Sequence, residues 1–223
     1  MTLNALTDRD KHLLEVMTVI SFVMGINSFL FEIMRSRSGI AAQRAYTQDG
    51  KYLVNVRYSG QWYDIRDFVQ PSDPDVITVF KQYGPDYWAL FDFVCRHVSY
   101  RLDIGEFFQF PPETLDRQLG DCEDSANLLT SLLRNSRDIP AYSVLGAYCG
   151  YGHAWCYTQG QILETTFTRA MTTIDPQNYY PYVYYDEQGV VELWPGALSE
   201  LFSLRRDETR KLKIMAKVMA GYG

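Results

Sequence analysis

The apolar residues in the centre of the chain predict a strong helix over residues 121–134. Its apolar positions share one helical face, and they are Cys122, Ala126, Leu129 and Leu133. Asp121 is a favourable N-cap, and Glu123 and Asp124 stand in the first turn, where the helix dipole favours negative charge. The pattern therefore predicts an amphipathic helix whose first residue is a cysteine.

Helical spacing recurs in four other segments, which are residues 16–31, 76–83, 86–97 and 198–219. The first segment carries no charge, but it is shorter than the roughly 20 residues that a membrane-spanning helix needs. Mixed charges precede it, whereas a secretory signal has a purely basic flank. We therefore expect a buried helix in a cytoplasmic protein, with a membrane-anchored protein as the alternative. The last segment is basic and amphipathic, and a solvated helix face is the common role of such a pattern.

Alternating apolar residues and turn signals predict short strands on both sides of the central helix. We expect a hairpin over residues 51–68 and an extended loop over residues 104–112. After the central helix, strands are expected over residues 141–148, 153–157, 161–166, 182–185 and 190–193. A helix followed by an antiparallel meander is typical of an α+β domain.

The composition fits a folded domain and argues against nucleic acid as a partner and against two kinds of cysteine site. The chain has 223 residues, of which 47% are hydrophobic, and this is enough for a full core. With 21 Lys and Arg against 27 Asp and Glu, the net charge is −6, which disfavours nucleic acid as a partner. The four cysteines contain no C-x-x-C pair, so neither a zinc knuckle nor a redox motif is expected.

Of the four cysteines, Cys122 has the position in the sequence that best suits a nucleophile. The unpaired N–H groups and the positive dipole at the start of a helix stabilise a thiolate. A two-residue loop at Gln159-Gly160 would place Glu164 diagonal to His153 on one face of a hairpin, within reach of the imidazole. The residues alone thus suggest a nucleophile, a base and a carboxylate that orients the base. The other cysteines, Cys95, Cys149 and Cys156, are expected in the core.

Four motifs carry a family resemblance. They are Phe108-Gln-Phe-Pro-Pro-Glu-Thr-Leu115, Gly120-Asp-Cys-Glu-Asp-Ser-Ala126, Gly152-His-Ala-Trp155 and Ile162-Leu-Glu-Thr-Thr166. Together they resemble the transglutaminase-like superfamily, in particular its bacterial and archaeal cysteine peptidases, over about residues 86–170. The resemblance implies a papain-like fold with Cys122, His153 and Glu164 as the triad. Glu164 stands where the family more commonly has aspartate, and Asp175 is the alternative third member.

The resemblance implies two further features of the site. Gln109 is similar to the side-chain oxyanion donor of papain-like sites, and the alternative is a hydrogen bond within its loop. Asp121, Glu123 and Asp124 are similar to an acidic cluster that holds calcium in some bacterial relatives. The alternative is a helix cap, because three carboxylates give fewer than the six to eight oxygen ligands that calcium takes.

The organisation and function expected from the sequence follow from these features. We expect one compact domain, with a helix-and-hairpin elaboration in residues 1–70, the catalytic core in residues 71–196 and a basic helix in residues 197–223. The expected activity is cysteine-dependent hydrolysis of amide bonds in a protein or peptide substrate, with no cofactor required. The alternatives are acyl transfer from protein glutamine, as crosslinking or deamidation, and a catalytically silent interaction module.

Overall fold

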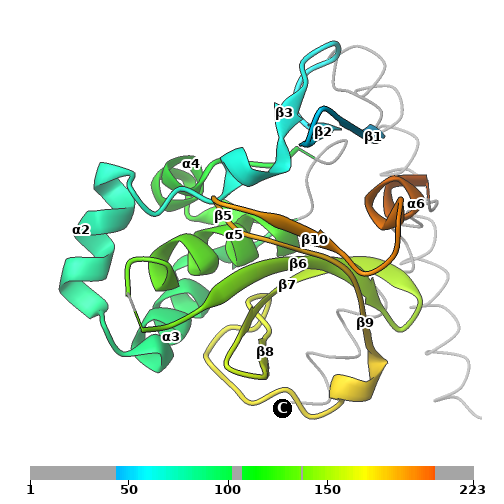
Figure 1. Ribbon diagram of the computed structural model, residues 1–223. Coiled ribbons are helices and arrows are strands. Elements are labelled where there is room, and N and C mark those ends of the chain that lie inside the picture. The colour runs from blue at the N-terminus through cyan, green and yellow to red at the C-terminus, as the bar shows by residue number, and fades with distance from the viewer. Residues whose placement is uncertain (1–43, 102–106, 137, 204–223) are drawn as a thin grey trace, which may run out of the picture. The chain divides into compact units, whose positions relative to one another are not determined.

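A computed structural model describes residues 44–101, 107–136 and 138–203 (Figure 1). The helix predicted over residues 16–31 lies outside the described residues, as does most of the helix predicted over residues 198–219. In the described part of the chain, no helix has both the length and the apolar character needed to cross a membrane.

The described helices agree with the sequence patterns at most positions. They are α2 (Pro74–Tyr83), α3 (Tyr87–His97), α4 (Pro111–Arg117), α5 (Cys122–Leu133) and α6 (Ala197–Ser203), with 3₁₀ turns η2 (Ile65–Phe68) and η3 (Pro176–Asn178). Asp73 and Asp86 cap α2 and α3 by accepting hydrogen bonds from first-turn N–H groups. Helix α4 corrects the prediction of an extended loop over residues 104–112, because the first two residues of the helix fall in that range. Its two leading prolines are compatible with a helix start, where the missing N–H has no intrahelical acceptor to lose.

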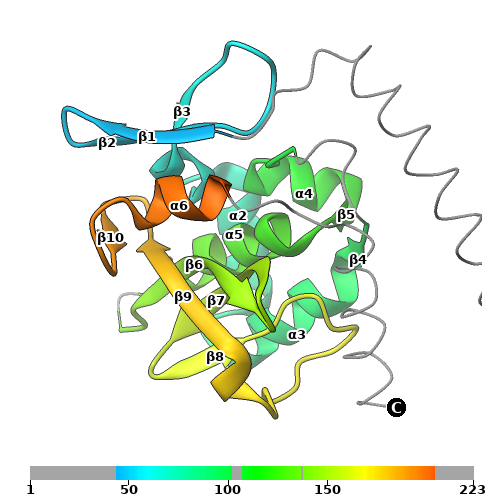
Figure 2. The same ribbon diagram turned by 90° about the vertical axis from the view of Figure 1, so that its right-hand side faces the viewer.

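The main sheet is antiparallel and has the strand order β10-β9-β6-β7-β8 within the described residues (Figures 1 and 2). Its strands are β6 (Ala141–Tyr148), β7 (Tyr151–Thr158), β8 (Gln161–Leu163), β9 (Tyr179–Tyr185) and β10 (Val190–Glu192). All five strands were predicted. Strand β8 is shorter than expected, so Glu164 follows the strand directly and does not lie within it.

Two small sheets complete the described strands. One has the order β1-β2-β3, from Arg44–Gln48, Lys51–Asn55 and Tyr63–Asp64, and the other pairs β4 (Ser99–Tyr100) with β5 (Leu119–Gly120) in parallel. The hairpin predicted over residues 51–68 is confirmed, because β2 pairs with β3 in antiparallel orientation, Leu53 with Asp64 and Val54 with Tyr63. Strand β1 adds a further antiparallel partner to β2 across Asp49-Gly50, and η2 ends the segment.

Helix α5 is the centre of the packing, since it contacts β6 and β7 and also α2, α3 and α4. All of its residues are buried, the polar ones as well as those of the predicted apolar face. Its polar side chains are paired inside the protein. The contacts are Ser125 with Thr165, Asn127 with Tyr185 and Thr130 with Ser143. Hydrogen bonding of this kind offsets the cost of burying polar groups.

Two tight turns set the register of the main sheet. Cys149-Gly150 joins β6 to β7 and Gln159-Gly160 joins β7 to β8, and all four residues have positive φ, as type I′ hairpins require. The predicted pairing after Gln159-Gly160 is confirmed, because Cys156 pairs with Leu163 and Thr158 with Gln161. The prediction for Cys149 is wrong, because this residue is exposed at its turn, whereas Cys95 and Cys156 are buried as expected.

Gly146 on β6 faces His153 on β7 and lies at an irregularity in the pairing of β6 with β9. A Cβ atom at this position would lie 2.6 Å from the ring of Trp155 and 2.3 Å from the carbonyl oxygen of Tyr180. The absence of a side chain therefore lets the Trp155 ring lie against the strand. One contact is with backbone, so a larger residue cannot be accommodated by a rotamer change alone.

We expect Gly146→Ala to lower the free energy of unfolding by about 1–3 kcal/mol, because it overpacks the sheet beside Trp155. Urea titration monitored by tryptophan fluorescence measures this change. Gly189→Ala is the matched control, since a Cβ atom there meets nothing within 4 Å. Equal stability of the two variants would contradict the steric account.

Candidate active site

Cys122 is the first residue of α5, and it is 1% exposed. The strand before it, β5, is short, and Gly120 allows close approach to Asp124: an added Cβ atom would lie 2.7 Å from the Asp124 Cβ atom. The cysteine is thus held at the helix N-terminus, where N–H groups and the helix dipole favour a negative charge. Ser125 in the next turn contacts Thr165 with a separation of 2.9 Å between the hydroxyl oxygens, which ties α5 to the segment after β8.

Asp124 anchors the loop that precedes α4. Its Oδ1 atom accepts a hydrogen bond from the backbone N–H of Gln109 at 2.7 Å, and its Oδ2 atom accepts one from the Gln109 side-chain amide at 2.6 Å. The N–H of Asp121 also approaches Oδ2, at 3.3 Å. The buried Asp124 carboxylate therefore connects the start of α5 to the loop through hydrogen bonds.

The structure places Gln109 differently from the predicted oxyanion donor. Its amide nitrogen donates to the Leu119 carbonyl oxygen at 3.1 Å as well as to Asp124, so both amide hydrogens are used within the protein. These hydrogen bonds join Gln109 to β5 and α5, so they also differ from the alternative of a hydrogen bond within the loop. Gln109 fixes the Asp124 carboxylate at the first turn of α5.

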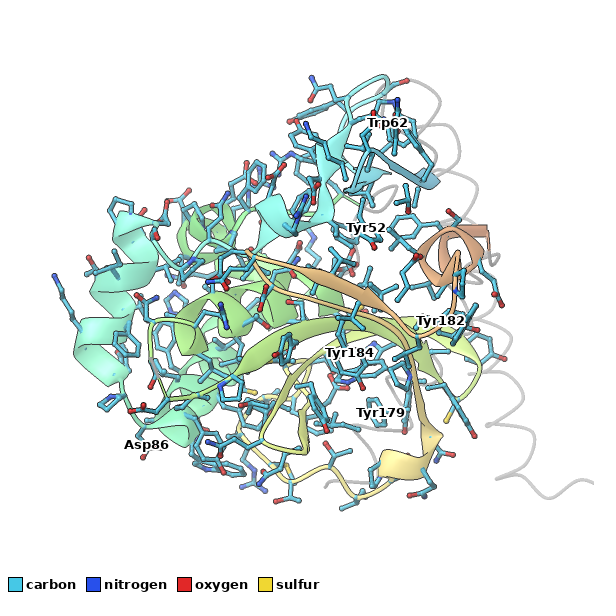
Figure 3. All side chains as sticks on the ribbon, viewed as in Figure 1. Tyr52, Trp62, Asp86, Tyr179, Tyr182 and Tyr184 are labelled. Carbon is cyan, nitrogen blue, oxygen red and sulfur yellow. The ribbon has the colours of Figure 1, made fainter. Side chains whose placement is uncertain are left out.

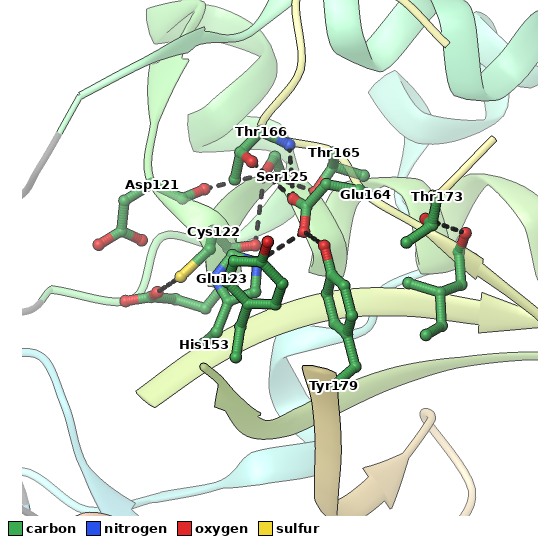
Figure 4. A network of polar contacts seen from close by, with 12 residues as sticks. Asp121, Cys122, Glu123, Ser125, His153, Glu164, Thr165, Thr166, Thr173 and Tyr179 are labelled. Carbon is green, nitrogen blue, oxygen red and sulfur yellow. Dashed lines mark hydrogen bonds and ion pairs between the residues drawn. The ribbon is translucent and has the colours of Figure 1, made fainter. Parts of the chain in front are cut away.

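His153 on β7 and Glu164 after β8 form a buried contact, with 2.7 Å between the Nε2 and Oε2 atoms (Figure 4). The two residues are 7% and 1% exposed, respectively. The predicted hairpin geometry accounts for this contact, because the register that pairs Cys156 with Leu163 carries Glu164 past the strand end on the side of His153. The sequence prediction that a carboxylate is aimed at the imidazole agrees with this geometry.

His153 and Glu164 each stabilise the charged form of the other. Burial lowers the pKa of His153, but the Glu164 carboxylate and a negative charge on Cys122 outweigh burial and raise that pKa to about 10. Burial raises the pKa of Glu164, but His153 and the hydroxyls of Thr166 and Tyr179 outweigh it and hold that pKa below its ordinary value. The favoured state near neutral pH is therefore an imidazolium beside a carboxylate.

Cys122 belongs to the same cluster. Its charge and a hydrogen bond are among the causes that raise the pKa of His153, and by reciprocity an imidazolium favours the Cys122 thiolate. In the protonated state, the Cys122 thiol donates to Glu123 Oε2, with 3.2 Å between sulfur and oxygen. The adjacent carboxylate opposes a thiolate, so the imidazolium and the helix terminus must outweigh it.

Asp175, the alternative third member of the triad, is hydrogen-bonded to Tyr148 and Asn178. Its Oδ2 atom accepts hydrogen bonds from the Tyr148 hydroxyl at 2.6 Å and from the Asn178 side-chain amide at 3.1 Å. The residue caps η3, on the segment that leads into β9. Between the two carboxylates considered, the geometry favours Glu164 as the partner of His153.

The acidic residues beside Cys122 only partly match a calcium site. Ligand atoms of Asp121, Cys122 and Glu123 lie within 4.8 Å of one another, and all three residues are buried. Asp124 is bound to Gln109 and is not in this group. Two carboxylates and a thiol do not complete the shell of six to eight oxygens that calcium takes, so the described side chains do not fit the ion as arranged. Calcium binding at Asp121, Glu123 and Asp124 stays a prediction.

Sequence reasoning missed three contacts at Glu164. The N–H and hydroxyl of Thr166 donate to Oε1, at 3.1 and 2.6 Å, and the Tyr179 hydroxyl donates to Oε2 at 2.8 Å. The threonine contacts are local, because Thr166 follows Glu164 by only two residues. The Tyr179 contact is not local, because the position of Tyr179 depends on β9 joining the sheet next to β6.

Comparisons with known proteins give structural matches at low similarity. No protein-family model and no curated protein matches the chain. Among solved structures, a candidate cysteine protease from Cytophaga hutchinsonii is 20% identical with a TM-score of 0.39, covering 52% of this chain and 42% of that one. LapG from Legionella pneumophila is 14% identical in two forms. For the EGTA-treated form the TM-score is 0.40, and the match covers 68% of this chain and 98% of LapG. For the calcium-bound form the TM-score is 0.38, and the match covers 60% of this chain and 97% of LapG.

The chain spans less than half the length of the candidate cysteine protease from Cytophaga hutchinsonii. At this level of similarity, a function has to be argued from the chemistry of the chain's own residues.

Proposed function

We propose that this protein is a cysteine peptidase that hydrolyses amide bonds in a protein or peptide substrate. Cys122 is the nucleophile, His153 transfers the proton, and Glu164 orients His153. The observation that carries the proposal is the buried contact of 2.7 Å between His153 and Glu164. Cys122 contributes to the same electrostatic cluster, and it begins a helix. A nucleophile, a base and an orienting carboxylate in this order are the parts of an acyl-transfer site.

The proposed reaction has two steps. The Cys122 thiolate attacks the carbonyl carbon, and collapse of the tetrahedral intermediate breaks the C–N bond while the His153 imidazolium gives its proton to the departing amine. A thioester remains on Cys122. Water then attacks the thioester carbon, His153 takes a proton from that water, and cleavage of the C–S bond releases the acid. We expect the backbone N–H of Cys122 to donate to the oxyanion of both steps, at the helix terminus whose dipole favours negative charge.

Hydrolysis is preferred to acyl transfer because water needs no second substrate site. Acyl transfer would proceed through the same thioester and would differ only in the acceptor, a primary amine in place of water. A peptide library assayed with and without an added amine separates the two reactions, because only transfer incorporates the amine into the product.

Cys122→Ala is expected to abolish hydrolysis, because no thioester can form, while the fold is retained. The assay is cleavage of a fluorogenic peptide library, and mass spectrometry of acid-quenched parent protein should find the acyl adduct on Cys122. Cys149→Ser is the matched control, because Cys149 is exposed at a turn outside the cluster. Cleavage by Cys122→Ala at the parental rate would show that the nucleophile is misassigned.

Glu164→Gln is expected to lower kcat/KM on the order of 10²-fold or more, because the carboxylate that orients and charges His153 is lost. The parent should lose activity as the pH rises through the His153 pKa of about 10, since the imidazolium is needed to protonate the leaving amine. In the variant, burial is no longer opposed by Glu164, so this alkaline limb should move to lower pH. Asp175→Asn should keep the parental profile, and the reverse ranking of the two variants would transfer the role to Asp175.

A further inference from the structure

We propose that Tyr179 and Thr166 are positioning residues, which hold the Glu164 carboxylate ionised and aimed at His153. This inference rests on the proposed function, since it concerns how the third member of the triad is fixed. Neither residue is expected to touch the substrate. Both act through Glu164, and the network they form is drawn in Figure 4.

The Glu164 carboxylate has a full set of donors. Oε1 accepts from the N–H and hydroxyl of Thr166 at 3.1 and 2.6 Å, and Oε2 faces His153 at 2.7 Å and the Tyr179 hydroxyl at 2.8 Å. A carboxylate has about four lone-pair sites, so these contacts fix both its position and the orientation of its plane. Glutamate has one more rotatable bond than aspartate, and this additional freedom is removed by the donors on Oε1.

The Tyr179 ring is itself held in place by packing. Tyr179 begins β9, where it pairs with Tyr148 of β6, and Figure 3 labels it at that end of the strand. Its ring centroid lies 4.5 Å from that of Tyr148, 5.1 Å from that of Trp155 and 6.1 Å from that of His153. The residue is 6% exposed. A ring packed on several sides presents its hydroxyl in one direction, towards Glu164.

The donors also determine when Glu164 is charged. Burial raises the pKa of Glu164, and hydrogen bonds from Thr166 and Tyr179 act with His153 to lower it. Removal of either hydroxyl should raise that pKa, because the ionised form loses a donor. A protonated Glu164 no longer favours the imidazolium, so the acid limb of activity should move to higher pH.

The test compares two pairs of variants, each with a chemically matched control. Tyr179→Phe removes one hydroxyl from Glu164, and Tyr185→Phe removes one buried hydroxyl that donates to Asn127 and not to Glu164. Thr166→Val removes the second hydroxyl at nearly constant shape, and Thr166→Ser restores it. The measurements are kcat/KM and the rate of Cys122 alkylation by iodoacetamide, both as functions of pH, with residue-level mass spectrometry for the alkylation.

We expect Tyr179→Phe and Thr166→Val to shift the acid limb upward by roughly one pH unit and Thr166→Ser to restore it, as the loss of a hydrogen bond to a charged group implies. Tyr185→Phe should keep the parental profile. Unshifted profiles in both Tyr179→Phe and Thr166→Val, or an equal shift in Tyr185→Phe, would overturn the inference. Failure of the proposed function has a different signature, which is equal hydrolysis by the parent and by Cys122→Ala.

Discussion

The buried contact between His153 and Glu164 is the interaction on which the account of this protein depends. An isolated carboxylate would be expensive to bury at 1% exposure, and an isolated imidazolium at 7% exposure would lose its proton. Placed 2.7 Å apart, each favours the charged form of the other. The remaining carboxylate sites are filled by Thr166 and Tyr179, so the charge is hydrogen-bonded on both oxygens. These hydrogen bonds and the opposite charge offset the cost of removing the two charged groups from water. Removal of one member would leave the charge of the other uncompensated.

The sheet and the central helix supply the three parts of the cluster from distant positions in the sequence. The type I′ turn at Gln159-Gly160 sets the register that brings Glu164 to His153. Helix α5 packs on β6 and β7, and its first residue is Cys122. The proposed nucleophile therefore begins a helix that packs on β7, the strand of His153. The proposed chemistry depends on this packing, because a shift of α5 along the sheet would separate Cys122 from His153.

The negative charge around Cys122 is the main electrostatic cost of the site. Glu123 accepts from the thiol in the protonated state, and Asp121 lies in the same buried group. Asp124 has a separate role, because its carboxylate is bound by Gln109 and secures the loop before α4. The acidic residues thus fall into two groups: Asp124 holds the helix start against the loop, whereas Asp121 and Glu123 lie beside the proposed nucleophile. A thiolate at Cys122 depends on the opposing effect of the His153 imidazolium.

Much of this arrangement could be predicted from the sequence, and the failures have physical causes. The start of α5 and the pairing of β7 with β8 depend on local signals, an acidic first turn and a two-residue turn, so Cys122, His153 and Glu164 could be grouped in advance. Tyr179 could not, because its place depends on the long-range pairing of β9 with β6. Gln109 was assigned by similarity to papain-like sites, but its amide hydrogens are taken by Asp124 and Leu119. The burial of every residue of α5 was also missed, because polar partners on other elements compensate for a polar face that would otherwise need solvent.

The most direct test of the central claim is the protonation state of the His153 ring. Nitrogen NMR spectroscopy of protein labelled at histidine distinguishes an imidazolium from either neutral tautomer, and the His153 signal is assigned by its loss in His153→Gln. Since the His153 pKa is raised to about 10, the ring should carry protons on both nitrogens at about pH 8. The Glu164→Gln variant should show a neutral ring under the same conditions. A neutral His153 ring in the parent protein at that pH would contradict the proposed ion pair and the mechanism built on it.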